Sequence, residues 1–202
     1  MFDLYYALRI ILRAFFMKEG INMKTNKITK IAALSAIAAI LQYAAMFIPF
    51  KVGGFLDLDI SDFPAIIGTL AMGPVAGVFV ELIKNILHLP VTTTGYVGEL
   101  ANFIVNGVFV LAIGYIYRYN KTKKGAVIAL VFGTILMTAA AVLTNRFIML
   151  PMFIKGAPAS VYWNTVLTLI TPFNFARGAV LSLITFFSYK KLRVLLKDKT
   201  NL

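Results

Sequence analysis

Apolar runs long enough to cross a lipid bilayer recur along this sequence, with short basic stretches between them. The first run, Ile28 to Ile48, would measure about 31 Å as an α-helix, and a hydrocarbon core is about 30 Å thick. Within such a core every backbone N–H and C=O needs a partner in the protein, which an α-helix supplies by itself. Because 60% of the residues are hydrophobic and 14% are charged, the sequence predicts an all-α integral membrane protein with several transmembrane helices.

The run from Phe63 to Leu89 is predicted to form two helices, because Gly73-Pro74 interrupts it and a proline inside a helix costs about 3 kcal/mol. A single helix would also place Arg118 and the lysines after it outside the cell, against the positive-inside tendency. The first helix of the pair would be about 15 Å long, too short to cross, so the loop before it is expected to dip into the protein and leave a recess on the outer side. The six predicted segments are Ile28–Ile48, Phe63–Met72, Pro74–Leu89, Gly98–Tyr117, Gly125–Leu150 and Pro172–Tyr189, with an outer connection at residues 151–170.

The net charge of +12 follows this layout. Twelve Lys and Arg residues flank the predicted cytoplasmic ends, whereas the outer loops hold only Lys51 and Lys155. This bias predicts a multi-pass protein of the cell membrane with both termini in the cytoplasm. Since the basic residues lie between apolar runs, the expected surroundings are a lipid bilayer, and no nucleic-acid partner is predicted.

The predicted membrane domain covers residues 24–195 and is followed by a basic cytoplasmic tail at 196–202. Residues 1–23 form an N-terminal extension with two interpretations. They form a basic amphipathic helix on the membrane surface, or translation starts at Met23 and the extension is a mis-assigned start. We favour the second, because Lys18-Glu19-Gly20 can be encoded by a purine-rich ribosome-binding sequence.

Polar side chains interrupt the apolar segments at positions predicted to lie near the outer side. Asn174 and Arg177 are three residues apart at the start of the last segment, and an ionised side chain inside a membrane is costly enough to indicate a site. Asn102, Asn106 and Asn145 are predicted at the same depth. Amides and a guanidinium suit a planar heterocycle with carbonyl and ring-nitrogen acceptors.

Other polar residues have structural interpretations. Glu81 and Lys84 share a helical face and are expected to neutralise each other. Asp62 precedes Pro64 at the start of a predicted helix, where helix capping is the favoured role. His88 has no second metal ligand at a suitable spacing, so no metal site and no role are assigned to it.

The motifs of several enzyme classes are absent from the sequence. It contains no phosphate-binding loop, so the chain is not expected to hydrolyse ATP itself. One His, no Cys and no Gly-x-Ser-x-Gly leave little for nucleophilic catalysis. The sequence therefore predicts a binding or transport protein without catalytic residues or cofactor.

Four sequence blocks resemble the substrate-binding S components of energy-coupling factor (ECF) vitamin transporters, and in particular their riboflavin-specific RibU type. The resemblance covers roughly residues 24–195. The second block is shared among many S components, whereas the other three favour the riboflavin-specific type. The blocks are Leu56-Asp57-Leu58-Asp59-Ile60-Ser61-Asp62-Phe63-Pro64, Gly73-Pro74-Val75-Ala76-Gly77 with Lys84-Asn85, Asn145-Arg146-Phe147 running to Leu150-Pro151, and Pro172-Phe173-Asn174-Phe175-Ala176-Arg177-Gly178.

The resemblance implies the six-helix S-component fold, with riboflavin captured from outside the cell beneath a lid formed by the loop after the first helix. It also implies a transmembrane coupling subunit, which Ala32 and Ala36 would contact, and two cytoplasmic ATPases. Two positions depart from the riboflavin-specific pattern, which often has Lys at Arg177 and Thr at Asp57; an extra carboxylate at Asp57 would disfavour a phosphorylated flavin. The predicted substrate-binding residues are Asn145, Asn174, Arg177, Asp57, Leu58, Asn102 and Lys84.

Three alternatives stay open on the sequence alone. The chain is an S component for FMN or another heterocyclic vitamin, a stand-alone secondary transporter with Glu81 as a proton site, or a membrane enzyme that depends on His88 or Glu81. A ligand panel, and transport by the lone chain in liposomes, would separate these alternatives.

Overall fold

The computed structural model describes residues 25–47, 51–52, 56–57, 59–92 and 94–196. Of the described residues, 31–196 belong to one packed unit, and the helix packing is that of this unit. The predicted N-terminal extension and residues 197–202 of the predicted tail lie outside the described residues, as does Leu58.

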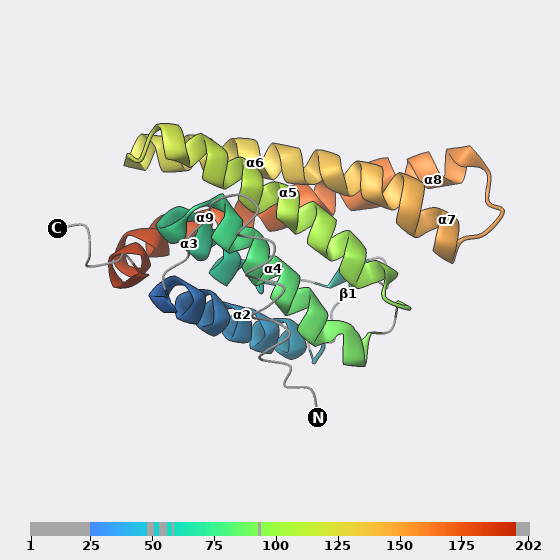
Figure 1. The fold of residues 1–202 in the computed structure, drawn as a ribbon. Helices are drawn as coiled ribbons and strands as arrows, with labels where there is room; N and C mark the ends of the chain where they lie inside the picture. The colour runs from blue at the N-terminus through green and yellow to red at the C-terminus, as the bar shows by residue number, and fades with distance from the viewer. Residues whose placement is uncertain (1–24, 48–50, 53–55, 58, 93, 197–202) are drawn as a thin grey trace, which may run out of the picture. The chain divides into compact units, whose positions relative to one another are not determined.

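Helices dominate the described part of the chain (Figure 1). The α-helices are α2 (Thr25–Ala45), α3 (Phe63–Met72), α4 (Pro74–His88), α5 (Val97–Tyr119), α6 (Lys123–Thr144), α7 (Leu150–Phe153), α8 (Ala159–Thr165) and α9 (Thr171–Leu196). A 3₁₀ turn, η1 (Leu89–Val91), and two five-residue π-helices, η2 (Asn145–Met149) and η3 (Val166–Ile170), extend or join them. Two short antiparallel strands, β1 (Lys51–Val52) and β2 (Leu56–Asp57), lie between α2 and α3.

Five helical stretches of the described chain are long and apolar enough to span a membrane, and α3 is a sixth, shorter one. The five are Asn26–Ala45, Pro74–Val91, Val97–Tyr119, Lys123–Phe153 and Ala159–Ser188. The predicted fold class, six helices of which one is short, is therefore confirmed.

The predicted break at Gly73-Pro74 is also confirmed. Gly73 has φ = 101°, a conformation that glycine adopts without the penalty paid by other residues, and it separates α3 from α4. Pro74 is the first residue of α4, where a missing N–H leaves no helical hydrogen bond unmade. Seven of the ten residues of α3 are buried, so this short helix lies inside the protein.

The last helical stretch begins earlier than the predicted start at Pro172. Helical structure resumes at Ala159 and continues through η3 into α9, so the stretch that is long and apolar enough to span a membrane begins 13 residues before Pro172, at Ala159. Both π-helices end two residues before a proline, Pro151 or Pro172. A π-turn shifts the hydrogen-bond register, and this shift lets the helix continue where proline has no N–H to donate.

Small residues allow the long helices to approach closely. Helix α5 packs between α4 and α6, and α9 packs against α6 and α3. A Cβ atom added to Gly114 of α5 would lie 2.5 Å from Cβ of Pro74, and one added to Gly178 of α9 would lie 2.8 Å from Thr134 of α6. Membrane helices use such small residues because lipid offers no hydrophobic driving force for their association.

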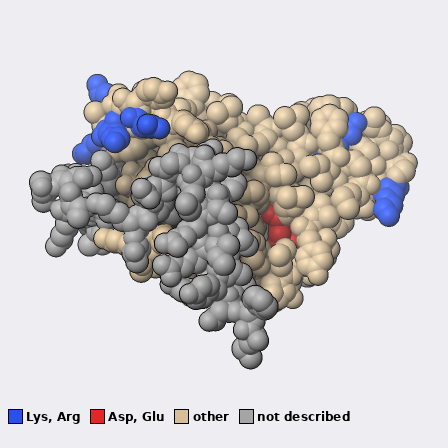
Figure 2. Space-filling model, viewed as in Figure 1, with Lys and Arg blue, Asp and Glu red and all other residues tan. Residues whose placement is uncertain are grey.

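Charged side chains are distributed unevenly over the visible surface (Figure 2). Lys and Arg gather at the end where α5 joins α6, and fewer appear at the opposite end near α7 and α8. Asp and Glu atoms show only in a hollow between these ends. Between the two ends, the described residues of the face in view show few charged side chains, as expected for a protein surrounded by lipid.

Four ionisable side chains form a buried ion cluster: Asp62, Glu81, Lys84 and Arg177. Nζ of Lys84 contacts Oδ1 of Asp62 and lies 2.8 Å from Oε2 of Glu81. Arg177 donates from Nη2 to the other carboxylate oxygen of Asp62. The side chains of Asp62, Glu81 and Lys84 are completely buried, and Arg177 is 9% exposed.

The cluster confirms the predicted neutralisation of Lys84 by Glu81 and corrects the role of Asp62. Asp62 precedes α3, yet its side chain makes no capping hydrogen bond. Its carboxylate instead bridges a lysine of α4 and an arginine of α9. Two buried cations attract the carboxylate more strongly than the peptide N–H groups of one helix end do.

The substitution Lys84→Met is expected to destabilise the protein. It removes one partner of a buried ion pair and leaves Asp62 and Glu81 less compensated, a loss that costs about 3 to 5 kcal/mol. The midpoint of thermal denaturation in detergent should fall clearly below that of the unaltered chain. The matched control is Lys124→Met, an exposed lysine in the first turn of α6, and equal midpoints for the two variants would contradict a stabilising role of the cluster.

Candidate functional site

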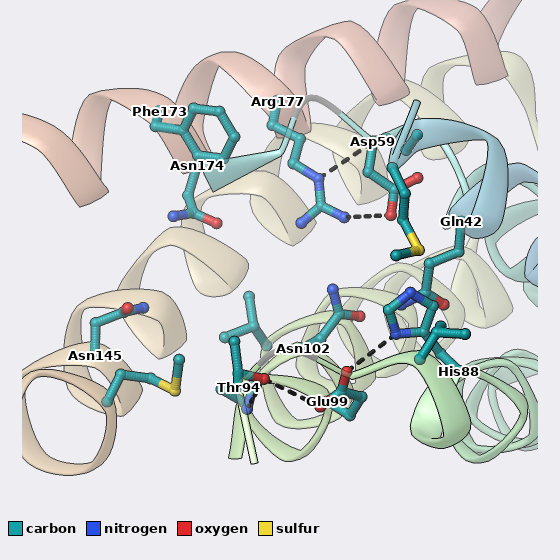
Figure 3. Close-up of a pocket in the computed structure, with 17 residues that line it drawn as sticks. Gln42, Asp59, His88, Thr94, Glu99, Asn102, Asn145, Phe173, Asn174 and Arg177 are labelled. Atoms are coloured by element: carbon teal, nitrogen blue, oxygen red, sulfur yellow. Dashed lines mark hydrogen bonds and ion pairs between the residues drawn. The ribbon is translucent and has the colours of Figure 1, made fainter. Parts of the chain in front are cut away.

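A cavity of about 260 Å³, just below the usual size of small-molecule pockets, opens where the ends of several helices meet (Figure 3). It lies between the end of α2, the segment before α3, the region joining α4 to α5, the π-helix η2 and the beginning of α9. The lining residues with polar side chains are Gln42, Asp59, His88, Thr94, Glu99, Asn102, Asn145, Asn174 and Arg177.

Asn145 and Asn174 each bind the backbone of their own helix through the amide nitrogen. Nδ2 of Asn145 donates to the carbonyl of Ala141 at 2.8 Å, and Nδ2 of Asn174 donates to that of Ile170 at 2.9 Å. Neither Oδ1 atom receives a hydrogen bond from the described residues. Both amides can therefore offer a carbonyl acceptor, and one remaining N–H each, to a bound molecule.

The side chain of Asn102 is held through its carbonyl oxygen and not through its amide nitrogen. Its Oδ1 accepts a hydrogen bond of 2.9 Å from Nδ2 of Asn106, which lies one turn further along α5 and is completely buried. Because this bond uses the carbonyl, the amide nitrogen of Asn102 is left as a donor. Asn102 thus adds a donor to the cavity wall that holds the acceptors of Asn145 and Asn174.

Arg177 connects the cavity to the buried ion cluster. Its Nε donates to the backbone carbonyl of Asp59 at 3.3 Å, and its Nη2 contacts Asp62 and lies 3.8 Å from Oδ2 of Asp59. The Nη1 group makes no hydrogen bond within the described part of the chain. This third branch of the guanidinium is available to a ligand while the other two hold the segment before α3.

The carboxylate of Glu99 and the ring of His88 lie on the cavity wall and were not among the predicted site residues. Nδ1 of His88 is 3.0 Å from Oε1 of Glu99, and Oε2 of Glu99 accepts hydrogen bonds from Thr92 and Thr94 at 2.7 and 3.2 Å. The sequence did contain a signal for Glu99, because this carboxylate lies in an apolar segment three residues before Asn102. His88 had no such signal, because its partner lies eleven residues away across a loop.

The structure brings together four of the predicted substrate-binding residues, Asn102, Asn145, Asn174 and Arg177. Lys84 lies outside the cavity lining, in the buried ion cluster. Asp57 belongs to strand β2, but its side chain and all of Leu58 lie outside what the structure describes. Within the described residues, no group of three His, Cys, Asp or Glu side chains is placed to hold a metal ion.

Comparisons with known proteins agree with this architecture. The family model "ECF transporter, substrate-specific component" matches residues 26–189. The riboflavin transporter RibU of Staphylococcus aureus (strain TCH60) is 34% identical over 185 residues, covering 89% of this chain and 97% of that protein. The riboflavin transporter FmnP of Bacillus subtilis (strain 168) is 34% identical over 182 residues, covering 85% and 94%.

A solved structure of the S component of a bacterial ECF transporter superposes with a TM-score of 0.73 and 32% identity, covering 87% of this chain and 100% of that one. Fold, sequence and family model thus coincide over the six helices. The chain is a membrane protein that belongs to the family of substrate-specific (S) components of ECF transporters.

Proposed function

We propose that this chain is the riboflavin-binding subunit of an ECF transporter that takes riboflavin into the cell. The observation that carries the proposal is the convergence of Asn102, Asn145, Asn174 and Arg177 on one cavity at the end of the helical bundle. The relatives named as riboflavin transporters support the same ligand.

The hydrogen-bonding groups suit the edge of the isoalloxazine ring. That edge alternates a carbonyl, an N–H and a second carbonyl, so it needs a donor, an acceptor and a donor from the protein. The Oδ1 atoms of Asn145 and Asn174 supply acceptors, and Nδ2 of Asn102 and Nη1 of Arg177 supply donors. Phe173, Val105 and Met149 line the same cavity and offer apolar contacts to the ring faces.

The transport cycle we propose requires partners. A transmembrane coupling subunit and two cytoplasmic ATPases would supply the energy, since the sequence has no phosphate-binding loop of its own. Ala32 and Ala36 on the exposed face of α2 are the proposed contact with the coupling subunit. Their neighbours Ser35 and Ala39 are buried and pack within the chain, so two small-residue faces of one helix serve different purposes.

The proposed orientation has both termini in the cytoplasm and the cavity facing outward. It rests on the basic residues at the α5–α6 connection and beyond α9. The proposed role of the segment between α2 and α3, to which Asp59 belongs, is that of a lid over the ligand.

Riboflavin binding is expected to weaken about tenfold or more when Asn174 is replaced by Ala, because a buried hydrogen-bond partner of the ligand is lost. The measurement is quenching of riboflavin fluorescence by the purified protein in detergent. The matched control is Asn164→Ala, since Asn164 is exposed on α8. Equal affinities of both variants would remove Asn174 from the site, and no quenching by the unaltered chain at micromolar protein would reject riboflavin as the ligand.

Enlarging the exposed small-residue face of α2 is expected to block assembly without affecting the ligand site. Ala36→Leu should abolish copurification with the coupling subunit, because a close helix–helix approach tolerates no larger side chain. Riboflavin affinity of the isolated chain should stay unchanged. Ala139→Leu on the exposed face of α6 is the control; a normal complex with Ala36→Leu would show that this face is not the interface.

A further inference from the structure

We propose that the side of the cavity formed by Gln42, His88, Thr94 and Glu99, here called the acceptor side, binds the hydroxyl groups of the ligand and rejects a phosphorylated ligand. The inference rests on the proposed function and deepens it, because it makes the chain selective for riboflavin against FMN.

Three of the four residues of the acceptor side lie across the cavity from the two amides that suit the ring. In Figure 3, Gln42, His88 and Glu99 lie on one side, whereas Asn145 and Asn174 lie on the other. All five line the same cavity. Because the two sides line one cavity, a ligand whose ring edge binds Asn145 and Asn174 can contact the acceptor side with its substituent.

The carboxylate of Glu99 is held firmly and keeps capacity for one more donor. It is 7% exposed, and its oxygens contact Nδ1 of His88 and the hydroxyls of Thr92 and Thr94. A carboxylate offers about four lone-pair sites, and these three contacts leave one on Oε1. A hydroxyl of the ligand can donate to it.

Two buried polar atoms on the same side have no partner within the described residues. They are Oε1 of Gln42 and Nε2 of His88. When Nδ1 of a neutral His88 donates to Glu99, Nε2 is an acceptor. Burying an acceptor without a partner costs about 1 to 3 kcal/mol, and a polyol chain, which carries one O–H donor on each hydroxyl, would relieve that cost.

A phosphate group has the wrong chemistry for this side. It carries a charge of about −1.5 to −2 near neutral pH and presents acceptor oxygens. Here it would meet the carboxylate of Glu99 and acceptors that need donors. Like charges at close range in a partly buried site repel each other strongly, so the arrangement selects against FMN through repulsion as well as through missing hydrogen bonds.

The experiment compares the affinities of riboflavin, FMN and lumiflavin, which has the ring without the polyol chain. For the unaltered chain we expect FMN and lumiflavin each to bind at least about tenfold more weakly than riboflavin. In Glu99→Gln the charge is lost while the size is kept, and the affinity ratio of riboflavin to FMN should fall by about tenfold or more.

Two further variants separate charge from packing. Glu99→Asp keeps the negative charge and should keep the preference against FMN even where it lowers riboflavin affinity. Thr94→Val removes one hydroxyl that orients Glu99 and should weaken riboflavin more than lumiflavin, whereas Thr168→Val, at an exposed threonine of η3, should change neither.

The outcomes distinguish this inference from the proposed function. If riboflavin binds but FMN or lumiflavin binds equally well, or if Glu99→Gln leaves the riboflavin to FMN ratio unchanged in a protein that still binds riboflavin, the acceptor side is wrongly assigned and the proposed function stands. If none of the three flavins binds the unaltered chain, the proposed function fails, and this inference fails with it.

Discussion

The carboxylate of Asp62 is the interaction on which the rest of the site depends. It contacts Lys84 of α4 through one oxygen and Arg177 of α9 through the other, and so ties the start of α3 to two long helices. In a membrane interior an uncompensated charge is far more costly than in water. The three groups therefore stabilise one arrangement of these helices, and that arrangement brings Arg177 to the cavity.

Polar groups of the cavity wall also have partners within the protein. Asn145 and Asn174 each donate one amide hydrogen to a carbonyl of their own helix. Asn145 is the first residue of the π-helix η2, and Asn174 follows the last residue of η3 by four positions. A hydrogen bond to the backbone of the same helix fixes the side-chain orientation without a partner from another helix. Each amide is thereby held in place, and its Oδ1 atom can still accept a hydrogen bond.

The sequence was sufficient for features that depend on local patterns. Apolar length predicted the helices, Gly73-Pro74 predicted the break before α4, and the cost of polar groups in lipid singled out Asn174 and Arg177. Features set by distant contacts were missed. Asp62 finds partners 22 and 115 positions away, so its capping role was the natural local interpretation. Pro172 looked like a helix start, because the local pattern does not show that the π-helix η3 lets the helix continue through this proline. The contact between His88 and Glu99 depends on how the α4–α5 connection folds.

The structure explains why an arginine is suitable at position 177, where the riboflavin-specific pattern often has a lysine. Both side chains carry one positive charge, so either balances Asp62. Only the planar fork of Arg177 bonds the carbonyl of Asp59 through Nε and Asp62 through Nη2 while Nη1 still faces other partners. A compact ammonium has no such fixed division of donors. Arg177 therefore links the position of the segment before α3 to the geometry of the cavity.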